Sequence, residues 1–133
     1  MKVVILAAGQ GKRLKPLTNE IPKALVKVLD RPIIDYQVKA LKENGLNDIT
    51  VIVGYKADQL KEYARKNNLK VIENKDYEKT NNMYSLSLFD SDEDVLIMNG
   101  DVIFDKEIIS ELIDLKGSFI AVDRGTYDPE AMK

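Results

Sequence analysis

Glycines and cationic side chains cluster directly after the first apolar run of the chain. The run is 3–6, Val-Val-Ile-Leu, and it is followed by Gly9, Gly11, Lys12 and Arg13. Glycine lacks a Cβ and reaches positive φ at little steric cost, so backbone N–H groups beside it can approach an anion closely. Lysine and arginine next to such a loop would neutralise a polyphosphate. The spacing therefore predicts a loop that binds the phosphates of a nucleotide and exposes one of them to attack.

Two common phosphate-binding loops do not fit this segment. The dinucleotide fingerprint G-x-G-x-x-G requires a third glycine, and Leu14 stands at that position. The Walker A pattern G-x-x-x-x-G-K-[ST] requires serine or threonine after Gly11-Lys12, where Arg13 stands, and its first glycine is also missing. An NAD-binding dehydrogenase half is therefore a weak alternative, and the Walker A interpretation fails.

Residues 6–23, LAAGQGKRLKPLTNEIPK, instead resemble the opening motif of the nucleotidyltransferases that make nucleotide-activated sugars and alcohols. The resemblance implies that Arg13 binds the β- and γ-phosphates of a nucleoside triphosphate and that Lys23 lies at the α-phosphate, both as catalytic residues. It also implies nucleotide contacts from a set of loop residues: Leu6, Ala7, Ala8, Gly9, Gly11 and Lys12. For Lys12 a solvated surface charge is an open alternative, and for Lys15 and Lys27 it is the preferred one.

Asp101 is the candidate metal ligand. It follows Gly100 at the end of the apolar run 94–98. Magnesium usually takes one or two carboxylates from a protein and completes its six oxygens with phosphate and water. A plain turn residue is the alternative for Asp101, but the family has a matching Gly-Asp whose aspartate holds the catalytic Mg²⁺. Asp105 matches nothing in the family and is expected to cap a helix.

The segment Asn81-Asn82-Met83-Tyr84-Ser85-Leu86 bears on the choice of base. It resembles the cytidylyltransferases that act on phosphocholine, or the related group that acts on inositol phosphate, so CTP is the favoured nucleotide. Asn81, Tyr84 and Ser85 are then expected at the nucleotide, together with Ala8 and with Gly54-Tyr55. An alternative role for Asn82 is capping a helix by accepting backbone N–H bonds. The two roles are not exclusive.

Hydrophobic periodicity supplies the elements that must position these residues. Strands are predicted at 3–6, 49–53, 70–73, 94–98 and 118–122. Helices are predicted from Asp30-Arg31-Pro32 to Gly45, at 57–67 and 106–115, with a helical turn at 83–89 and a polar tail at 123–133. This alternation predicts a parallel sheet covered on both faces, a Rossmann-like three-layer α/β/α fold. If strand 94–98 neighbours strand 3–6, the glycine loop and Asp101 share one crevice.

Composition bounds the remaining possibilities. The 133 residues suit one domain, 1–133, and carry 20 Lys and Arg against 22 Asp and Glu, for a net charge of −2. This balance lacks the basic excess expected of nucleic-acid or membrane binding. The chain has no cysteine and no histidine, so disulfides, thiolate sites and imidazole catalysis are excluded. We expect a cytoplasmic protein whose chemistry uses carboxylates, cations, backbone amides and Mg²⁺.

The resulting hypothesis is a magnesium-dependent nucleotidyltransferase. It would transfer CMP from CTP to a small phosphorylated acceptor, the phosphomonoester of an alcohol or sugar, and release pyrophosphate. Members of the family continue well beyond this length, with an acceptor pocket and a second metal-binding aspartate, and Asp123-Arg124 and residues 127–130 resemble the start of that half. We therefore expect a truncated form of the family's nucleotide-diphospho-sugar transferase-like fold, or a minimal chain whose acceptor site is supplied by another subunit. A homo-oligomer is compatible with either expectation. A half-domain that binds the nucleotide without transferring it is the alternative function.

Overall fold

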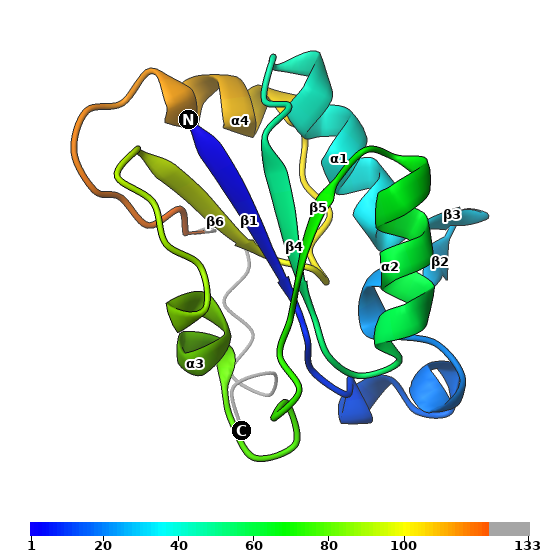
Figure 1. Ribbon diagram of the computed structural model, residues 1–133. Coiled ribbons are helices and arrows are strands. Elements are labelled where there is room, and N and C mark those ends of the chain that lie inside the picture. The colour runs from blue at the N-terminus through cyan, green and yellow to red at the C-terminus, as the bar shows by residue number, and fades with distance from the viewer. Residues whose placement is uncertain (123–133) are drawn as a thin grey trace.

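The computed structural model describes residues 1–122, which form a parallel β-sheet with helices on both faces (Figure 1). The strands of the sheet are β1 (Lys2–Ala7), β4 (Ile49–Val53), β5 (Lys70–Glu73) and β6 (Val95–Asn99). The helices are α1 (Ile33–Glu43), α2 (Ala57–Lys66), α3 (Asn82–Ser87) and α4 (Lys106–Ile113). Between β1 and α1 lie the 3₁₀ turns Lys12–Leu14, Leu17–Asn19 and Lys23–Leu25 and the antiparallel pair β2 (Lys27–Val28) and β3 (Arg31–Pro32). The predicted α/β fold is confirmed.

β1 is paired along both of its edges. The strand order is β5-β4-β1-β6, and each neighbouring pair is parallel. Ile5 lies beside Val51 on one side and beside Met98 on the other. The expectation that strand 94–98 neighbours strand 3–6 is therefore confirmed. Because parallel strands end at the same edge, the loop after β1 and the turn after β6 leave the sheet together.

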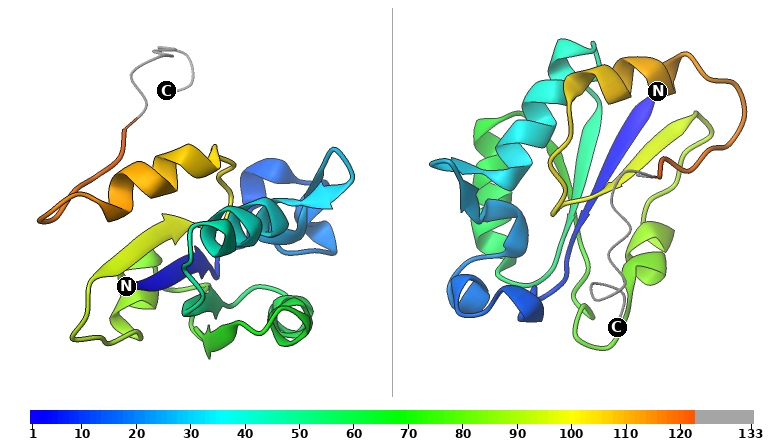
Figure 2. Two further views of the ribbon diagram at one scale, coloured as in Figure 1. Left: turned by 90° about the horizontal axis from the view of Figure 1, so that it is seen from above. Right: turned by 180° about the vertical axis from the view of Figure 1, so that it is seen from behind.

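The alternation of side chains along β1 divides the core into two layers. Val3 and Ile5 pack with buried residues of α1, α2 and α4, among them Ile34, Val38, Leu41, Leu60 and Ile109. Val4 faces the opposite layer, where Ile52 is buried and Leu86 of α3 is partly buried. Figure 2 shows α1 and α4 on one side of the sheet and α3 on the other. The predicted stripe of α1, Ile34, Val38 and Leu41, is fully within this core.

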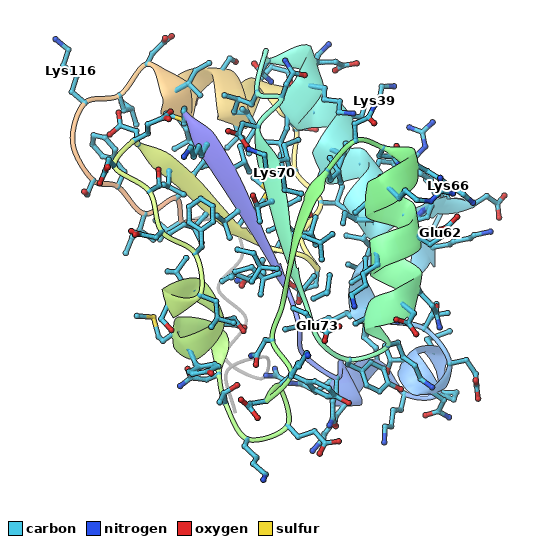
Figure 3. All side chains as sticks on the ribbon, in the orientation of Figure 1. Lys39, Glu62, Lys66, Lys70, Glu73 and Lys116 are labelled. Atoms are coloured by element: carbon cyan, nitrogen blue, oxygen red, sulfur yellow. The ribbon has the colours of Figure 1, made fainter. Side chains whose placement is uncertain are left out.

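α2 shows the amphipathic pattern that its sequence predicts. Leu60 and Ala64 are buried, whereas Glu62 pairs with Arg65 at 2.7 Å and with Lys66 at 3.6 Å. Figure 3 shows Glu62 and Lys66 on the same outer side of the helix. Such exposed pairs contribute little to stability, so α2 is held by its apolar side. Within residues 1–122, no helix has the length and apolar character needed to cross a membrane.

The start of α1 differs from the prediction. The helix begins after Pro32, not at 30–32, because a residue that precedes proline is disfavoured from helical backbone. Arg31 is therefore extended and pairs with Val28 across a tight turn in which Leu29 has a φ of 51°. The hydroxyl of Tyr36 donates to the Val28 carbonyl at 2.6 Å, which fastens this hairpin to the first turn of α1.

The strand predicted at 118–122 does not form. These residues follow α4, and Ile120 and Val122 are 89% and 70% exposed. β6 is the edge strand of the sheet and has no partner beyond β1 among the described residues. Strand propensity measures how well side chains suit a pleated, half-buried surface, so the composition of 118–122 does not by itself make these residues pair with the open edge of β6. The tail at 123–133, with Asp123-Arg124 and 127–130, lies outside the described residues.

Gly54 packs where β4 meets the loop after β1, and this contact yields a stability prediction. A Cβ at Gly54 would lie 2.7 Å from the carbonyl oxygen of Ala8 and 2.8 Å from Cβ of Tyr77. We expect Gly54→Ala to lower the free energy of unfolding by about 1–3 kcal/mol, measured by urea denaturation, because backbone would have to move.

Gly9→Ala is the matched control. A Cβ at Gly9 meets no atom within 4 Å, so this variant should not be destabilised. Unfolding midpoints for Gly54→Ala equal to those of the unsubstituted protein would show that the contact is not tight.

Candidate functional site

A pocket of about 340 Å³ opens at the carboxyl edge of the sheet, between the loop after β1 and the turn after β6. It is lined by residues that the sequence places far apart: Leu6, Ala7, Gly9, Gly11, Lys12, Arg13, Lys23, Ala24, Asn82, Asn99, Gly100 and Asp101. The predicted shared crevice is therefore present. It brings together the loop, both candidate catalytic residues and the candidate metal ligand.

The loop after β1 presents free backbone donors. Among residues 1–122, no protein acceptor receives a hydrogen bond from the backbone N–H groups of 9–13. Gly11 has a φ of 61°, a conformation that favours glycine, and its carbonyl accepts from the buried Thr18 hydroxyl at 2.7 Å. Successive N–H groups beside a residue with positive φ form a concave site for an anion. The loop therefore has the donors that a phosphate requires.

Tyr55 holds the loop after β1 in place through hydrogen bonds. Its backbone N–H donates to the Ala8 carbonyl at 2.9 Å. Its hydroxyl oxygen lies 2.6 and 3.0 Å from the carbonyl oxygens of Thr18 and Asn19, which share its single O–H donor. Ala8 is 5% exposed, and Gly54 is buried beside it. Ala8, Gly54 and Tyr55 were predicted to contact the nucleotide. None of the three lines this pocket, and all three support the loop; their contact with a nucleotide stays a prediction.

Positively charged side chains outnumber negatively charged ones in the pocket lining. Lys12, Arg13 and Lys23 line it together with a single carboxylate, that of Asp101. Lys23 forms an ion pair with Asp101, and each side chain is about one-third exposed, at 34% and 32%. Among the described residues neither Lys12 nor Arg13 has an acidic partner. The pocket therefore carries an excess of positive charge that suits a polyanion.

The ion pair of Asp101 with Lys23 was not predicted from the sequence. Local sequence gives no sign of it, because Lys23 and Asp101 lie on segments that only the β1–β6 pairing brings together. Asp105 stands at the first position before α4, as predicted, although only its backbone carbonyl accepts, from Ile108 N–H at 3.1 Å.

The segment at 81–86 is only partly at the pocket. Asn81, not Asn82, caps α3, since its side-chain oxygen accepts from Tyr84 N–H at 3.1 Å. The capping role predicted for Asn82 is therefore wrong, and Asn82 lines the pocket instead. The Ser85 hydroxyl is buried and accepts from Asn74 at 3.0 Å, so it takes no part in the pocket surface. Tyr84 is 40% exposed beside it and also lies outside the lining.

Three further residues were not predicted at the site. Ala24 and Asn99 line the pocket, and the side-chain oxygen of Asn99 accepts from Asn82 at 3.3 Å. Gln37 of α1 is buried behind the turn that carries Asp101. A signal for Gln37 was available, because it is a polar residue within the apolar stripe of a predicted helix, at i+3 from Ile34.

The donor set fits a magnesium ion bound together with phosphate. In the described part of the chain no three acidic, histidine or cysteine side chains converge, so no closed metal cage is present. Asp101 offers one hard carboxylate at the rim of a pocket lined with cations. Mg²⁺ is characteristically held by one or two carboxylates with phosphate oxygens and water in its other positions. Asp101 is the residue that would hold it here.

Comparison with known proteins identifies similar chains. The family model described as nucleotidyl transferase matches residues 2–124, which include the glycine loop, Lys23 and Asp101. The choline-phosphate cytidylyltransferase of Streptococcus pneumoniae is 49% identical over 88 residues, which cover 66% of this chain and 38% of that protein. The CTP:phosphoglutamine cytidylyltransferase of Campylobacter jejuni is 36% identical over 134 residues, covering 93% of this chain and 53% of that protein.

A solved structure agrees with these sequence matches. The CTP:phosphocholine cytidylyltransferase from Streptococcus pneumoniae superposes with a TM-score of 0.64 at 49% identity, over 65% of this chain and 38% of that one. The chain spans 38% of the length of the choline-phosphate cytidylyltransferase and 53% of the length of the CTP:phosphoglutamine cytidylyltransferase, which is about half or less of each protein.

Gly9 gives the most direct test of the loop. Its neighbourhood is open and its φ is not positive, so the fold does not require glycine there. We expect Gly9→Val to remain folded and to lose pyrophosphate binding by at least about tenfold, because a branched side chain would occupy the approach to the free N–H groups. Isothermal titration calorimetry with magnesium pyrophosphate measures this, and wild-type affinity in the folded variant would refute the assignment of the loop.

Proposed function

This chain belongs to the nucleotidyl transferase family, as residues 6–23 predicted, and on that premise we propose that it transfers a nucleotidyl group from a nucleoside triphosphate to a phosphomonoester. The nucleotide is CTP, the acceptor is the phosphorylated form of a small alcohol or sugar, and pyrophosphate is released. The pocket that joins the free N–H groups of 9–13, three cationic side chains and Asp101 carries this proposal.

The reaction explains why these groups are needed. An oxygen of the acceptor phosphate attacks the α-phosphorus of the triphosphate, a new P–O–P bond forms, and the bond to the β-phosphate breaks. The attack brings negative charges together, so the barrier falls when fixed cations neutralise the transition state. A phosphate monoester is already ionised near neutral pH and needs no general base. A chain without histidine is therefore adequate for this chemistry.

Each cation has a distinct position in the proposed mechanism. The N–H groups of 9–13 and the side chains of Lys12 and Arg13 bind the β- and γ-phosphates and hold the pyrophosphate as it leaves. Lys23 neutralises charge at the α-phosphate. A magnesium ion, when bound, supplies further positive charge to the phosphate oxygens, and Asp101 would be its protein ligand.

The ion pair between Lys23 and Asp101 couples these roles. Without a nucleotide, each group neutralises the other. A triphosphate gives Lys23 a second anionic partner, so Lys23 exchanges the carboxylate for the α-phosphate and Asp101 becomes free to bind a cation. Mg²⁺ and the nucleotide should therefore bind with positive cooperativity, and Mg²⁺ alone should bind weakly.

Support for CTP comes from the relatives and from one segment of the sequence. Both relatives compared above are cytidylyltransferases, one acting on choline phosphate and one on phosphoglutamine by their names. The Asn-Asn-Met-Tyr-Ser-Leu segment at 81–86 places Asn82 in the pocket lining. The acceptor is proposed only as a class, because the relatives differ in it.

Pyrophosphate release tests the proposal. The protein is incubated with Mg²⁺, with each of the four common ribonucleoside triphosphates, and with phosphocholine, phosphoglutamine, inositol 1-phosphate or glucose 1-phosphate. We expect acceptor-dependent pyrophosphate with CTP above the other nucleotides. Nucleotide binding without product for any acceptor would favour the alternative of a binding half-domain, which the names of the relatives do not favour.

Lys23→Ala separates catalysis from binding. We expect the rate of transfer to fall by about 100-fold or more while CTP affinity falls by less than about tenfold, because the cation is needed most as charge builds at the α-phosphate. Steady-state kinetics and calorimetry measure the two effects. Lys15→Ala is the matched control, since Lys15 is exposed and outside the pocket lining. Equal losses of binding and rate in Lys23→Ala would contradict this role.

Asp101→Asn tests the metal ligand. Transfer should fall by roughly 100- to 1,000-fold, and CTP binding should lose its dependence on Mg²⁺, because the amide keeps the size of the side chain but not its charge. The free energy of unfolding should change by less than about 1 kcal/mol, since the ion pair with Lys23 is partly exposed. Asp105→Asn, which alters a nearby carboxylate outside this pocket, is the control. Magnesium dependence that persists in Asp101→Asn would place the cation elsewhere.

A further inference from the structure

Gln37 is a buried polar side chain that none of the roles above explains. It lies in the middle of α1, is 1% exposed, and shares its helix face with the core residues Ile34, Val38 and Leu41. A buried amide is costly unless its hydrogen bonds are made, and an apolar side chain of the same size would suit this position better for packing alone. Its presence in the core therefore needs a reason.

The amide nitrogen of Gln37 reaches the turn that carries Asp101. It donates to the carbonyl of Asn99 at 2.8 Å and to the carbonyl of Val102 at 2.7 Å. Because both neighbours are carbonyl oxygens, only the N–H₂ end of the side chain can satisfy them. These two carbonyls bracket Gly100 and Asp101, so one side chain spans the whole turn.

The remaining contacts of Gln37 and of the turn reinforce this interpretation. The Gly100 N–H donates to the Leu6 carbonyl of β1 at 2.9 Å, so the turn is fixed to the sheet on one side and to α1 on the other. The Gln37 side-chain oxygen is buried and has no partner among the described residues. A buried acceptor without a partner is destabilising, so the two donated bonds are made at a cost to the core.

We propose that Gln37 is a positioning residue that holds the Asn99–Val102 turn so that the Asp101 carboxylate stands ready to bind the magnesium ion of the nucleotide complex. The proposal rests on the proposed function, in which Asp101 is the metal ligand. Groups that orient a ligand from behind typically change metal affinity by 10- to 100-fold when they are removed. Gln37 acts through the turn and makes no contact with the substrate.

Gln37→Met tests the proposal, because it keeps the length and volume of the side chain and removes both donors. CTP binding is measured by calorimetry over a series of Mg²⁺ concentrations and also in EDTA. We expect the Mg²⁺ concentration for half-maximal binding to rise by about tenfold, with CTP affinity in EDTA unchanged within about twofold. Val38→Ala is the matched control: it removes core packing from the neighbouring position of α1, so it should lower stability without changing the dependence on Mg²⁺.

The outcomes separate this proposal from the function on which it rests. Wild-type magnesium dependence in a folded Gln37→Met variant overturns the positioning role and makes Gln37 a packing residue. A wild-type protein that binds CTP without regard to Mg²⁺ overturns the metal role of Asp101 itself. If Gln37→Met does not fold, Gln37→Asn replaces it, because an amide one methylene shorter cannot span both carbonyls and is expected to raise the Mg²⁺ requirement in the same direction.

Discussion

The parallel pairing of β1 with strands on both of its edges determines the rest of this structure. β4 ends beside the loop after β1 on one side and β6 ends beside it on the other, with Ala7 opposite Val53 and Leu6 opposite Asn99. The segments that follow β1, β4 and β6 therefore leave the sheet at the same edge. The glycine loop, the support from Tyr55 and the turn with Asp101 all follow from that register.

The pairing of β1 also explains how a small domain can form a charged pocket with little loss of stability. The cations and the carboxylate lie at the rim of the sheet, where they stay partly exposed, while the apolar layers beneath them supply the stability. Lys23 and Asp101 neutralise each other in this arrangement, and Gln37 fixes the turn from within the core. The charged side chains that line the pocket thus stay partly exposed to solvent, where their desolvation penalty is small.

Much of this arrangement could be predicted from the sequence because it depends on local patterns. Apolar runs and helical stripes gave the strands of the sheet and the core of α1, and the motif at 6–23 identified the loop and the family. The predictions that were wrong have separate causes. Residues 118–122 have the composition of a strand but pair with no strand of the sheet. The cap of α3 is Asn81 and not Asn82, and residue type does not distinguish these two adjacent asparagines.

The contacts that support the site were not predicted from the sequence. Ala8, Tyr55 and Ser85 are expected at the nucleotide, and that prediction is untested. The sequence did not predict the contacts that they make within the protein, where Tyr55 bonds the loop through Thr18 and Ser85 bonds Asn74. The sequence marks Gln37 as a polar residue within an apolar stripe, but not the carbonyls that it reaches. Those hydrogen bonds and the ion pair of Lys23 with Asp101 join segments more than sixty residues apart, and no local pattern encodes such contacts.

The fate of each phosphate of the nucleotide distinguishes nucleotidyl transfer from the other reactions of a triphosphate. The protein is incubated with Mg²⁺, a phosphomonoester acceptor and CTP labelled at either the α- or the γ-phosphate, and the products are separated. We expect the α-label to pass to the acceptor in a phosphoanhydride and the γ-label to leave in pyrophosphate. A γ-label that appears in inorganic phosphate or on the acceptor would contradict nucleotidyl transfer, because attack would then occur at the γ-phosphate and not at the α-phosphate.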